Sequence, residues 1–513
     1  MAQQALVDTH HDGDTLTLGV AVCQDALSPR ERVYAKGEGK MMDATDLCFT
    51  PATELAAMIR RRALSPVELM DAVFARIEAL NPRLNAYLTL DLEHAREQAQ
   101  AAEAAVMRGE ILKPLHGLPV SIKDLEPSAG LRCTYGSKFF EHNVADFDGM
   151  VTGRVKAAGG IVLGKTNTSH YGYKDMCDNL IGPPCRNPWN LQRTSGASSG
   201  GAAATVAAGL GPLAHGSDGA GSIRIPSALC GVFGLKPSFG RVPNWPNPDI
   251  WAARSHNGPI TRTVADAALL LGVMAGPDPR DPTSIDSAAE DYLAAIARPL
   301  EALHGLRVAW SVDFGYAPVD PEVRRVTAAA AERFQAFGCE VEAVNPPWDN
   351  PREAASAMWY VSYAARLGER YDQRPEWFEP SLAEMIEAGR RISGVQHGQA
   401  QLARTVFYEQ MRHFFERYDL LLTPQMPLGA WSVERGPSTI EGKPTPSMFD
   451  RLNFTFPFNQ TGQPAASVPC GFTSEGLPVA LQIVGRWHAD RLVLQAAAAC
   501  EQAAPWAQMR PPV

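Results

Sequence analysis

Three serines stand among small residues in "RTSGASSGG", residues 193–201. The central "GASSG" fits the G-x-S-x-G pattern in which many hydrolases present a nucleophile, so Ser198 is a candidate for attack on an acyl carbon. That motif needs a strand running into the serine and a helix leaving it. The run "GGAAATVAAGLG" after it predicts a helix, but the preceding "CRNPWNLQRT" is broken by proline and asparagine and favours a loop. The pattern therefore does not by itself make Ser198 the nucleophile.

The string "GGIVLGKT", residues 159–166, fits the phosphate-binding pattern G-x-x-x-x-G-K-[ST]. Such a loop needs a strand before its first glycine and a helix after its Lys-Thr pair. Here the interior Ile-Val-Leu is apolar enough to be the strand itself, and the preceding "VTGRVKAAG" has a helical pattern. We therefore expect a helix, a turn and a strand in this order, and no nucleotide site.

Other common kinds of site find little support. His170 and His215 suggest a Ser-His triad, but neither lies in a recognisable partner pattern. The 12 histidines include no H-E-x-x-H and the nine cysteines no C-x-x-C, so we expect no metal, no cofactor and reduced, cytoplasmic thiols. A net charge of −9 with mixed signs excludes a basic face for nucleic acid, and no apolar run approaches the roughly 20 residues of a membrane span. Small molecules are the expected partners.

A second segment of small residues follows in "HGSDGAGSIRIPSALCGVFGLKPSFGRV", residues 215–242. Its Ser222 lies 24 residues after Ser198. This pair of segments resembles the amidase signature family, whose hallmark is a glycine-serine segment and a G-S-x-R segment about two dozen residues later. The likeness covers roughly residues 45–505 and includes "HGLPVSIKD", "GKTNTSHYGY", "GPITRTVADAALLLGVMAG" and "NQTGQPAASVPCGFTSEGLPVALQIVG".

The resemblance implies a role for each of three residues. The family's nucleophile falls on Ser222, its bridging serine, which follows a cis peptide bond, on Ser198, and its base on Lys123. A lysine can act as a base near neutral pH only if burial lowers its pKa from ~10.4 by roughly 3 units. Lys123 closes the apolar run "GLPVSIK", where such burial is expected. A hydroxyl both donates and accepts, so Ser198 can relay a proton between the other two.

The resemblance also implies an oxyanion hole, formed by the backbone N–H groups of Gly219, Ala220, Gly221 and Ser222. Small side chains there let the main chain approach a substrate carbonyl. Alanine at position 220 departs from the family's more usual glycine, so a positive φ at this position would be strained. We expect Asp218 and Arg224, which flank the segment, to form a structural salt bridge that shapes it.

The elements that must position these residues follow from hydrophobic patterning. Short apolar runs alternate with helical patterns, and "SPVELMDAVFARIEAL" opens with a capping box from Ser65 to Glu68. The alternation predicts an α/β fold: a single large amidase-signature domain over residues 44–513, with a mixed central sheet covered by helices on both faces. Residues 345–460 predict a helical, aromatic-rich insertion. The expected strands are 117–123, 159–165, 306–311, 339–344, 418–424 and 477–485.

Residues 1–43 lack helical periodicity, and amphipathic patterning begins abruptly after the methionines at 41 and 42. We therefore interpret this tract as an N-terminal extension that is not native, with Met41 or Met42 as the natural start. A chain beginning at Met42 that failed to fold would contradict this interpretation.

The resemblance implies an amidase that hydrolyses C–N acyl bonds of aryl, aliphatic or lactam-derived amides, with esters and carbamates as further substrates, acting as a monomer or homodimer. The aromatic-rich insertion favours a roomy, apolar pocket over one for a small charged amide. Two alternatives stay open: the glutaminase-type subunit of a tRNA-dependent amidotransferase, and a catalytically silent binding protein.

Overall fold

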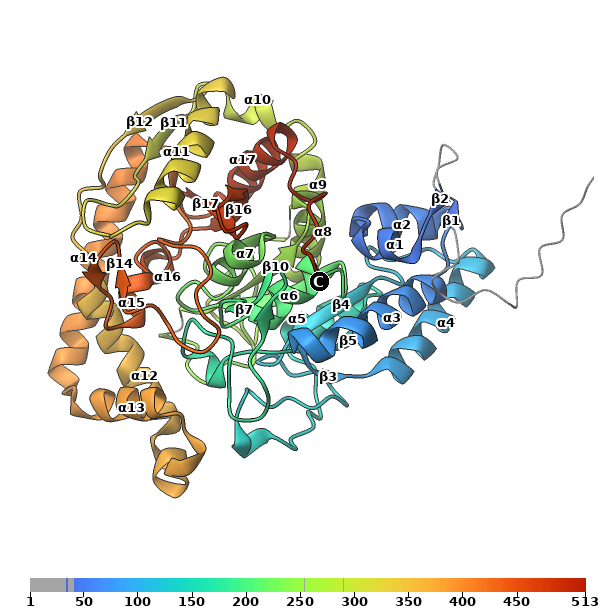
Figure 1. Ribbon diagram of the computed structural model, residues 1–513, viewed down its shortest axis with the longest axis horizontal. Helices are drawn as coiled ribbons and strands as arrows, with labels where there is room; N and C mark the ends of the chain where they lie inside the picture. Colours follow the sequence, from blue (N-terminus) through green and yellow to red (C-terminus); the bar gives the residue numbers. More distant parts are fainter. Residues whose placement is uncertain (1–33, 36–40, 253, 289) are drawn as a thin grey trace, which may run out of the picture.

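The computed structural model describes residues 34–35, 41–252, 254–288 and 290–513. Its centre is an 11-stranded sheet flanked by helices (Figure 1), which confirms the expected α/β class. In spatial order the strands are β12 (Glu340–Ala343), β11 (Arg307–Trp310), β13 (Leu420–Pro424), β17 (Pro478–Gly485), β16 (Ala465–Phe472), β9 (Phe233–Lys236), β10 (His256–Thr261), β8 (Leu213–Asp218), β4 (Pro119–Lys123), β5 (Ile161–Thr166) and β3 (Tyr87–Leu90).

The sheet is mixed, as expected. Strand β4 runs parallel to both β5 and β8, and β11 runs parallel to β12 and β13, whereas the other neighbouring pairs are antiparallel. Parallel neighbours end at the same edge of a sheet. The carboxyl ends of β4 and β8, at Lys123 and Asp218, therefore lie side by side, and this edge positions the site.

Helices pack on the sheet in layers. α6 packs with α7 against β8, β9 and β16, and α8 packs with α17 against β9, β10 and β16. The helices before residue 280 are α1 (Ala44–Phe49), α2 (Ala52–Arg60), α3 (Pro66–Leu84), α4 (Leu92–Arg108), α5 (Met150–Ala157), α6 (Gly200–Ala207), α7 (Arg224–Cys230) and α8 (Val264–Met274). The later ones are α9 (Tyr292–Ala295), α10 (Pro299–Leu303), α11 (Pro321–Ala336), α12 (Arg352–Gln373), α13 (Pro380–Arg391), α14 (Gly394–Arg417), α15 (Met448–Arg451), α16 (Pro457–Thr461) and α17 (Asp490–Ala503).

Most of the expected elements are confirmed. The six apolar runs form β4, β5, β11, β12, β13 and β17. The capping box opens α3: the Ser65 side chain accepts from the backbone N–H groups of Val67 and Glu68, and the Glu68 side chain accepts from the Ser65 N–H. The phosphate-loop look-alike is the buried strand β5, preceded by α5, so the helix–turn–strand interpretation is correct.

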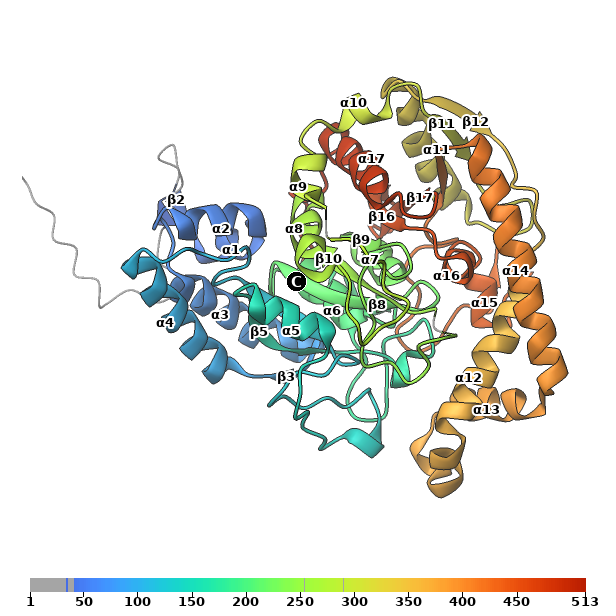
Figure 2. The same cartoon turned by 180° about the vertical axis from the view of Figure 1, so that it is seen from behind.

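One expectation needs correction. The residues before Ser198 are not simply a loop, because β7 (Asn190–Thr194) pairs there with β6 (Arg186–Asn187). This hairpin is separate from the central sheet, so the serine still does not follow a central strand. The range 345–460, predicted as a helical insertion, contains α12–α14 and also β13, the strand expected at 418–424, which belongs to the central sheet. Figure 2 shows α12–α14 at one end of the molecule and α1–α4 at the other.

The N-terminal extension lies mostly outside the described residues. Of that tract the structure describes Tyr34–Ala35 (β1), paired with Met41–Met42 (β2), and the Asp43 side chain that caps α1. The interpretation of Met41 or Met42 as the natural start stays a prediction. Across the described ranges, no helix combines the length and apolar character needed to cross a bilayer.

Candidate active site

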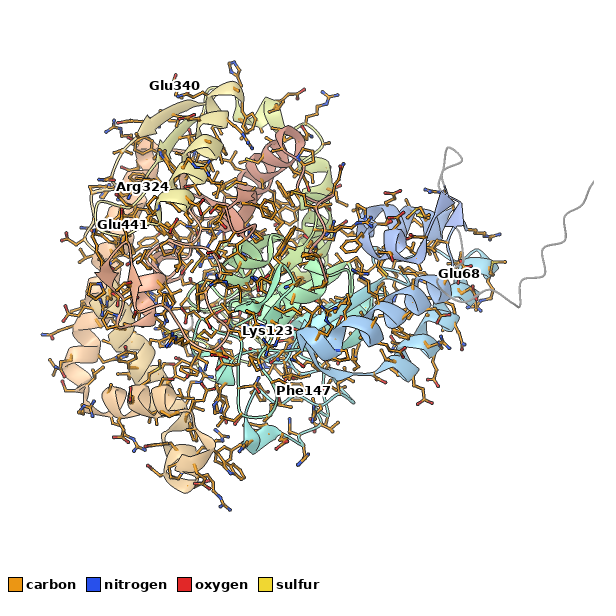
Figure 3. The ribbon with its side chains drawn as sticks, in the orientation of Figure 1. Glu68, Lys123, Phe147, Arg324, Glu340 and Glu441 are labelled. Atoms are coloured by element: carbon orange, nitrogen blue, oxygen red, sulfur yellow. The ribbon has the colours of Figure 1, made fainter. Side chains whose placement is uncertain are left out.

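Lys123 ends β4 with its side chain completely buried in the middle of the molecule (Figure 3). Its Nζ donates to Ser198 Oγ at 2.7 Å, and to the carbonyl oxygen and Oγ of Ser217, both at 3.0 Å. Burial lowers the pKa of Lys123 to about 7, although the nearby Asp218 carboxylate opposes this shift. A large fraction of the amine is therefore uncharged at neutral pH.

Ser198 lies in the turn between β7 and α6, and the peptide bond between Ala197 and Ser198 is cis. Its side chain is buried against Gly172, which has φ +73°. A Cβ at Gly172 would lie 3.3 Å from Ser198 Oγ, so glycine leaves room for the hydroxyl there.

Ser222 lies in the loop between β8 and α7, and its backbone carbonyl accepts from Ser199 N–H at 3.1 Å. This bond joins the two serine segments through the main chain. Ser198 and Ser222 line the same pocket, and Lys123 contacts Ser198 directly. The structure thus brings the three residues singled out in the sequence to one place.

Asp218 and Arg224 form the expected salt bridge, and both side chains are completely buried. The guanidinium reaches the carboxylate in bidentate fashion, with Nε–Oδ2 at 3.0 Å and Nη2–Oδ1 at 3.1 Å. Burial alone would raise the pKa of Asp218, but the Arg224 charge and its hydrogen bonds hold that pKa well below its usual range. The carboxylate is therefore a fixed negative charge beneath the serine loop.

The Asp218 carboxylate reduces the set of backbone donors expected in the oxyanion hole. Its Oδ1 accepts from Gly221 N–H at 2.6 Å, so this N–H is already engaged and the inclusion of Gly221 as a donor needs correction. The N–H groups of Gly219, Ala220 and Ser222 have no acceptor in the part of the chain that the structure describes. They are the donors that remain for a substrate oxygen.

The positive φ in this loop falls at Gly221, at +125°, and Ala220 adopts no such conformation. The expected strain at Ala220 is thus absent. A Cβ at Gly221 would lie 2.6 Å from Thr455 Cβ, and Thr455 Oγ1 donates to the Ala220 carbonyl at 2.6 Å. The glycine requirement at position 221 comes from both its φ and this close approach.

Sequence reasoning missed three residues that hold the site. Ser217, which contacts Lys123, stands next to Asp218 in the second small-residue segment, where it could have been found. Thr455 and Asn459 come from far along the chain, and Asn459 Nδ2 donates to the Asp218 carbonyl at 2.8 Å. Asn459 is the first residue of the segment beginning "NQTGQP", which carries part of the family resemblance. Thr455 lies before that segment and had no signal of its own.

A pocket of about 660 Å³ opens over the serines. Aromatic side chains line much of it, including Trp359 and Tyr363 from α12. The helical region thus supplies the apolar wall that the sequence suggested. The pocket also contains three arginines that the sequence analysis did not single out: Arg254, Arg366 and Arg370.

The two histidines considered for a triad are buried, and burial lowers the pKa of each to about 3. His215 Nε2 is 3.0 Å from Asn257 Oδ1, and within the described ranges both ring nitrogens of His170 lack a hydrogen-bond partner. Neither imidazole is hydrogen-bonded to a serine among the described residues. The Ser-His interpretation finds no support in this geometry.

Comparisons with known proteins show the family of this chain. An acylamidase of Rhodococcus erythropolis is 42% identical over 92% of this chain and 98% of its own length. A glutamyl-tRNA(Gln) amidotransferase subunit of Moorella thermoacetica is 37% identical over 91% of this chain and 99% of its own. The crystal structure of a bacterial aryl acylamidase of the amidase signature family superposes with a TM-score of 0.84 at 33% identity, covering 90% of this chain and 97% of that one. The profile of the Amidase family matches residues 68–494, and the chain belongs to this family.

Proposed function

We propose that this amide hydrolase attacks its substrate with Ser222, using Lys123 as the base and Ser198 as the proton relay. The observation that carries the proposal is the 2.7 Å hydrogen bond between Lys123 Nζ and Ser198 Oγ in a fully buried setting. An amine with a pKa of about 7 can accept a proton near neutral pH, which an ordinary lysine cannot.

In the first half of the reaction, the uncharged Lys123 amine takes the Ser198 hydroxyl proton while Ser198 takes the proton of Ser222. The Ser222 oxygen then attacks the amide carbon, and a tetrahedral intermediate forms. Its collapse breaks the C–N bond as Lys123 returns the proton through Ser198 to the leaving amine. Water repeats the sequence on the acyl-enzyme and releases the acid.

The negative charge on the tetrahedral oxygen needs fixed donors. We assign this role to the N–H groups of Gly219, Ala220 and Ser222, because Gly221 N–H already donates to Asp218. Asp218 and Arg224 would fix the loop that carries these donors. Removing a single donor of this kind typically lowers kcat by ~10² to 10³.

For substrates we propose aryl, aliphatic and lactam-derived amides, with esters and carbamates as further substrates of the same chemistry. Support comes from the aromatic lining of the pocket and from the relatives named as an acylamidase and an aryl acylamidase. We also propose that the enzyme works as a monomer or homodimer in the cytoplasm.

Labelling with a fluorophosphonate, followed by kinetics on a panel of amides, esters and carbamates read by product mass, tests the roles. We expect Ser222→Ala to lose labelling, and Ser222→Ala and Lys123→Ala each to lower kcat by ~10⁶, as removal of a nucleophile or base does in serine hydrolases. Ser198→Ala should retain a small remnant. The exposed Ser474→Ala serves as the matched control and should resemble wild type. Equal labelling of Ser222→Ala and wild type would refute the nucleophile.

A second candidate function is the glutaminase of a tRNA-dependent amidotransferase, which the 37% identity to the Moorella thermoacetica protein favours. This function predicts release of ammonia from glutamine and co-purification with partner proteins. Hydrolysis of amides by the isolated chain without glutaminase activity would exclude it.

A further inference from the structure

Arg254 is a buried arginine that forms no ion pair with a carboxylate among the described residues. It lies two residues before β10, it is only 8% exposed, and it borders the 660 Å³ pocket that contains Ser198 and Ser222. Among the described residues its guanidinium forms neither a hydrogen bond nor a salt bridge, and its Nε is buried without any partner. Burying an unpaired charge is costly, so such a group is normally found with an anion.

The guanidinium stays charged at neutral pH. Burial, aided by the neighbouring Arg404 charge, lowers the pKa of Arg254 to about 10. The Asp249 carboxylate acts against this shift, and Arg366 adds to it. A pKa of about 10 still leaves Arg254 protonated at pH 7. The pocket therefore presents a desolvated positive charge.

Two further arginines strengthen the positive field in this pocket. Arg366 and Arg370 project from α12, and each packs over an aromatic ring, Arg366 over Tyr363 at 5.4 Å and Arg370 over Phe140 at 5.2 Å. Neither makes a salt bridge with a carboxylate within the described ranges. The chain carries a net charge of −9, so this gathering of cations is opposite to its overall charge.

Glu126 and Asp249, the acidic residues that line the pocket, form no ion pair with Arg254 within the described ranges, although the Asp249 charge partly offsets that of Arg254. Glu126 Oε1 accepts from Val151 N–H at 2.9 Å, and burial raises the pKa of Glu126 to about 7. Asp249 Oδ1 accepts from Ala252 N–H at 3.3 Å. Both carboxyl groups are thus held by the main chain, and neither bonds to Arg254.

The backbone of Arg254 and the base of the Ser222 loop share one hydrogen-bond donor, the side chain of Asn459. Its carbonyl accepts from Asn459 Nδ2 at 3.3 Å, and the same amide donates to the Asp218 carbonyl at 2.8 Å, at the base of the Ser222 loop. Arg254 and Ser222 therefore keep a fixed relation within one pocket. An anion bound by Arg254 on the side of the 660 Å³ pocket would share that pocket with Ser222.

We propose that Arg254 determines specificity by binding a carboxylate carried by the substrate, so that the preferred amides are anionic. This inference rests on the proposed amide hydrolysis at Ser222. The planar guanidinium fork matches a carboxylate in bidentate geometry, and the aromatic wall accommodates the rest of the acyl or aryl group. The pocket thus combines the aromatic side chains of α12 with the positive charges of Arg254, Arg366 and Arg370, which modifies the expectation of a pocket unsuited to charged amides.

Matched substrate pairs test the proposal. One pair places the carboxylate on the acyl side, as the mono-p-nitroanilide of glutaric acid and its methyl ester. The other places it on the amine side, as 4-butyramidobenzoate and its methyl ester. In wild type, kcat/KM for the acid should exceed that for its ester by roughly 10- to 100-fold in at least one pair, the range for a charge-assisted hydrogen bond. The pair that shows the preference identifies the side.

Variants of Arg254 test whether this residue causes the preference for the acid over its ester. Arg254→Met should reduce the acid-to-ester ratio to near one, mainly through KM, and Arg254→Lys should restore part of it. The matched control is Arg262→Met, because Arg262 is 6% exposed, its Nε also lacks a partner, and it packs over the Phe49 ring rather than in the pocket. This control should keep the wild-type ratio.

The outcomes separate the two proposals. A wild-type ratio below about 3 in both pairs, or the same ratio in Arg254→Met as in wild type, overturns the carboxylate inference while amide hydrolysis stands. If wild type cleaves none of the four compounds, thermal-shift titration with the two acids decides: stabilisation of wild type but not of Arg254→Met supports the carboxylate site although the proposed hydrolysis has failed. Equal thermal shifts in wild type and Arg254→Met overturn the carboxylate inference. If Arg254→Met does not fold, the acid-to-ester ratio of wild type alone decides the carboxylate inference.

Discussion

The chemistry of the site depends on the oxygens around one amine. Lys123 has no carboxylate within hydrogen-bond distance among the described residues, and its three acceptors are neutral oxygens of Ser198 and Ser217. An uncharged amine has two N–H groups and one lone pair. With the N–H groups directed to Ser217, the lone pair faces the Ser198 hydroxyl, so Ser217 orients the base.

The pH dependence of kcat/KM follows from this environment. Burial disfavours the ammonium form, and the uncharged form is the one that accepts a proton. We therefore expect kcat/KM to rise about tenfold per pH unit below an apparent pKa of about 7 and to level off above it. Initial rates with a neutral anilide between pH 5 and 9 would measure the profile. A flat profile over that range would contradict Lys123 as the base.

At the scale of elements, the loop between β8 and α7 depends on one glycine. Gly221 combines a φ of +125° with the close approach of Thr455, and its N–H anchors the loop on Asp218. The proposed donors, the N–H groups of Gly219, Ala220 and Ser222, belong to the same loop and depend on this conformation. The loop is therefore shaped by contacts from β8 below and from the segment before α16 beside it.

Replacement of this glycine tests the loop. Gly221→Ala should lower kcat by ~10² to 10³, because a shifted loop loses oxyanion donors. The matched control is Gly272→Ala in α8, where a Cβ meets no atom within 4 Å. That change should retain activity and stabilise the protein by ~0.5 to 1 kcal/mol, as expected in a helix interior. Urea unfolding and single-turnover kinetics would compare the two, and wild-type kcat in Gly221→Ala would contradict the assignment.

Sequence patterning predicted those elements whose signal is local. Continuous apolar runs revealed six strands, and a capping box revealed the start of α3. Strand β8 was not recognised because "LAHGSD" mixes small, polar and charged residues, which only its neighbours in the sheet make into a strand. The three proposed reacting residues were found from motifs, whereas the support from Thr455 and the lack of a partner for Arg254 Nε among the described residues depend on contacts between distant segments.

At the scale of the whole molecule, the pocket is shared between the sheet and the helical region. Trp359 of α12 covers the serine loop closely enough that a Cβ at Gly219 would lie 3.3 Å from its ring. The same helix carries Tyr363 into the pocket. The position of α12 relative to the sheet therefore sets the size of the acyl or aryl site.

Replacement of Trp359 tests whether its indole contributes to substrate binding as well as to the stability of the fold. Trp359→Ala should destabilise the protein by ~3 to 5 kcal/mol and raise KM for aryl amides by about tenfold, because it empties part of the pocket. Trp348→Ala is the matched control: Trp359 is 9% exposed and Trp348 is 5% exposed, but Trp348 packs with Phe407 and Phe414 away from the pocket. It should lower the melting temperature without changing KM. Equal KM changes in both variants would contradict the pocket role.

The support of the serine loop also has a consequence for biosynthesis. Arg224 Nη1 donates to Gln482 Oε1 at 2.8 Å, and Asn459 Nδ2 holds the Asp218 carbonyl at 2.8 Å. A ribosome translates Ser222 long before it translates these two partners. A nascent chain that ends before α16 therefore carries Ser222 without either contact, and we expect the proposed nucleophile to acquire its loop shape only after β17 has been translated.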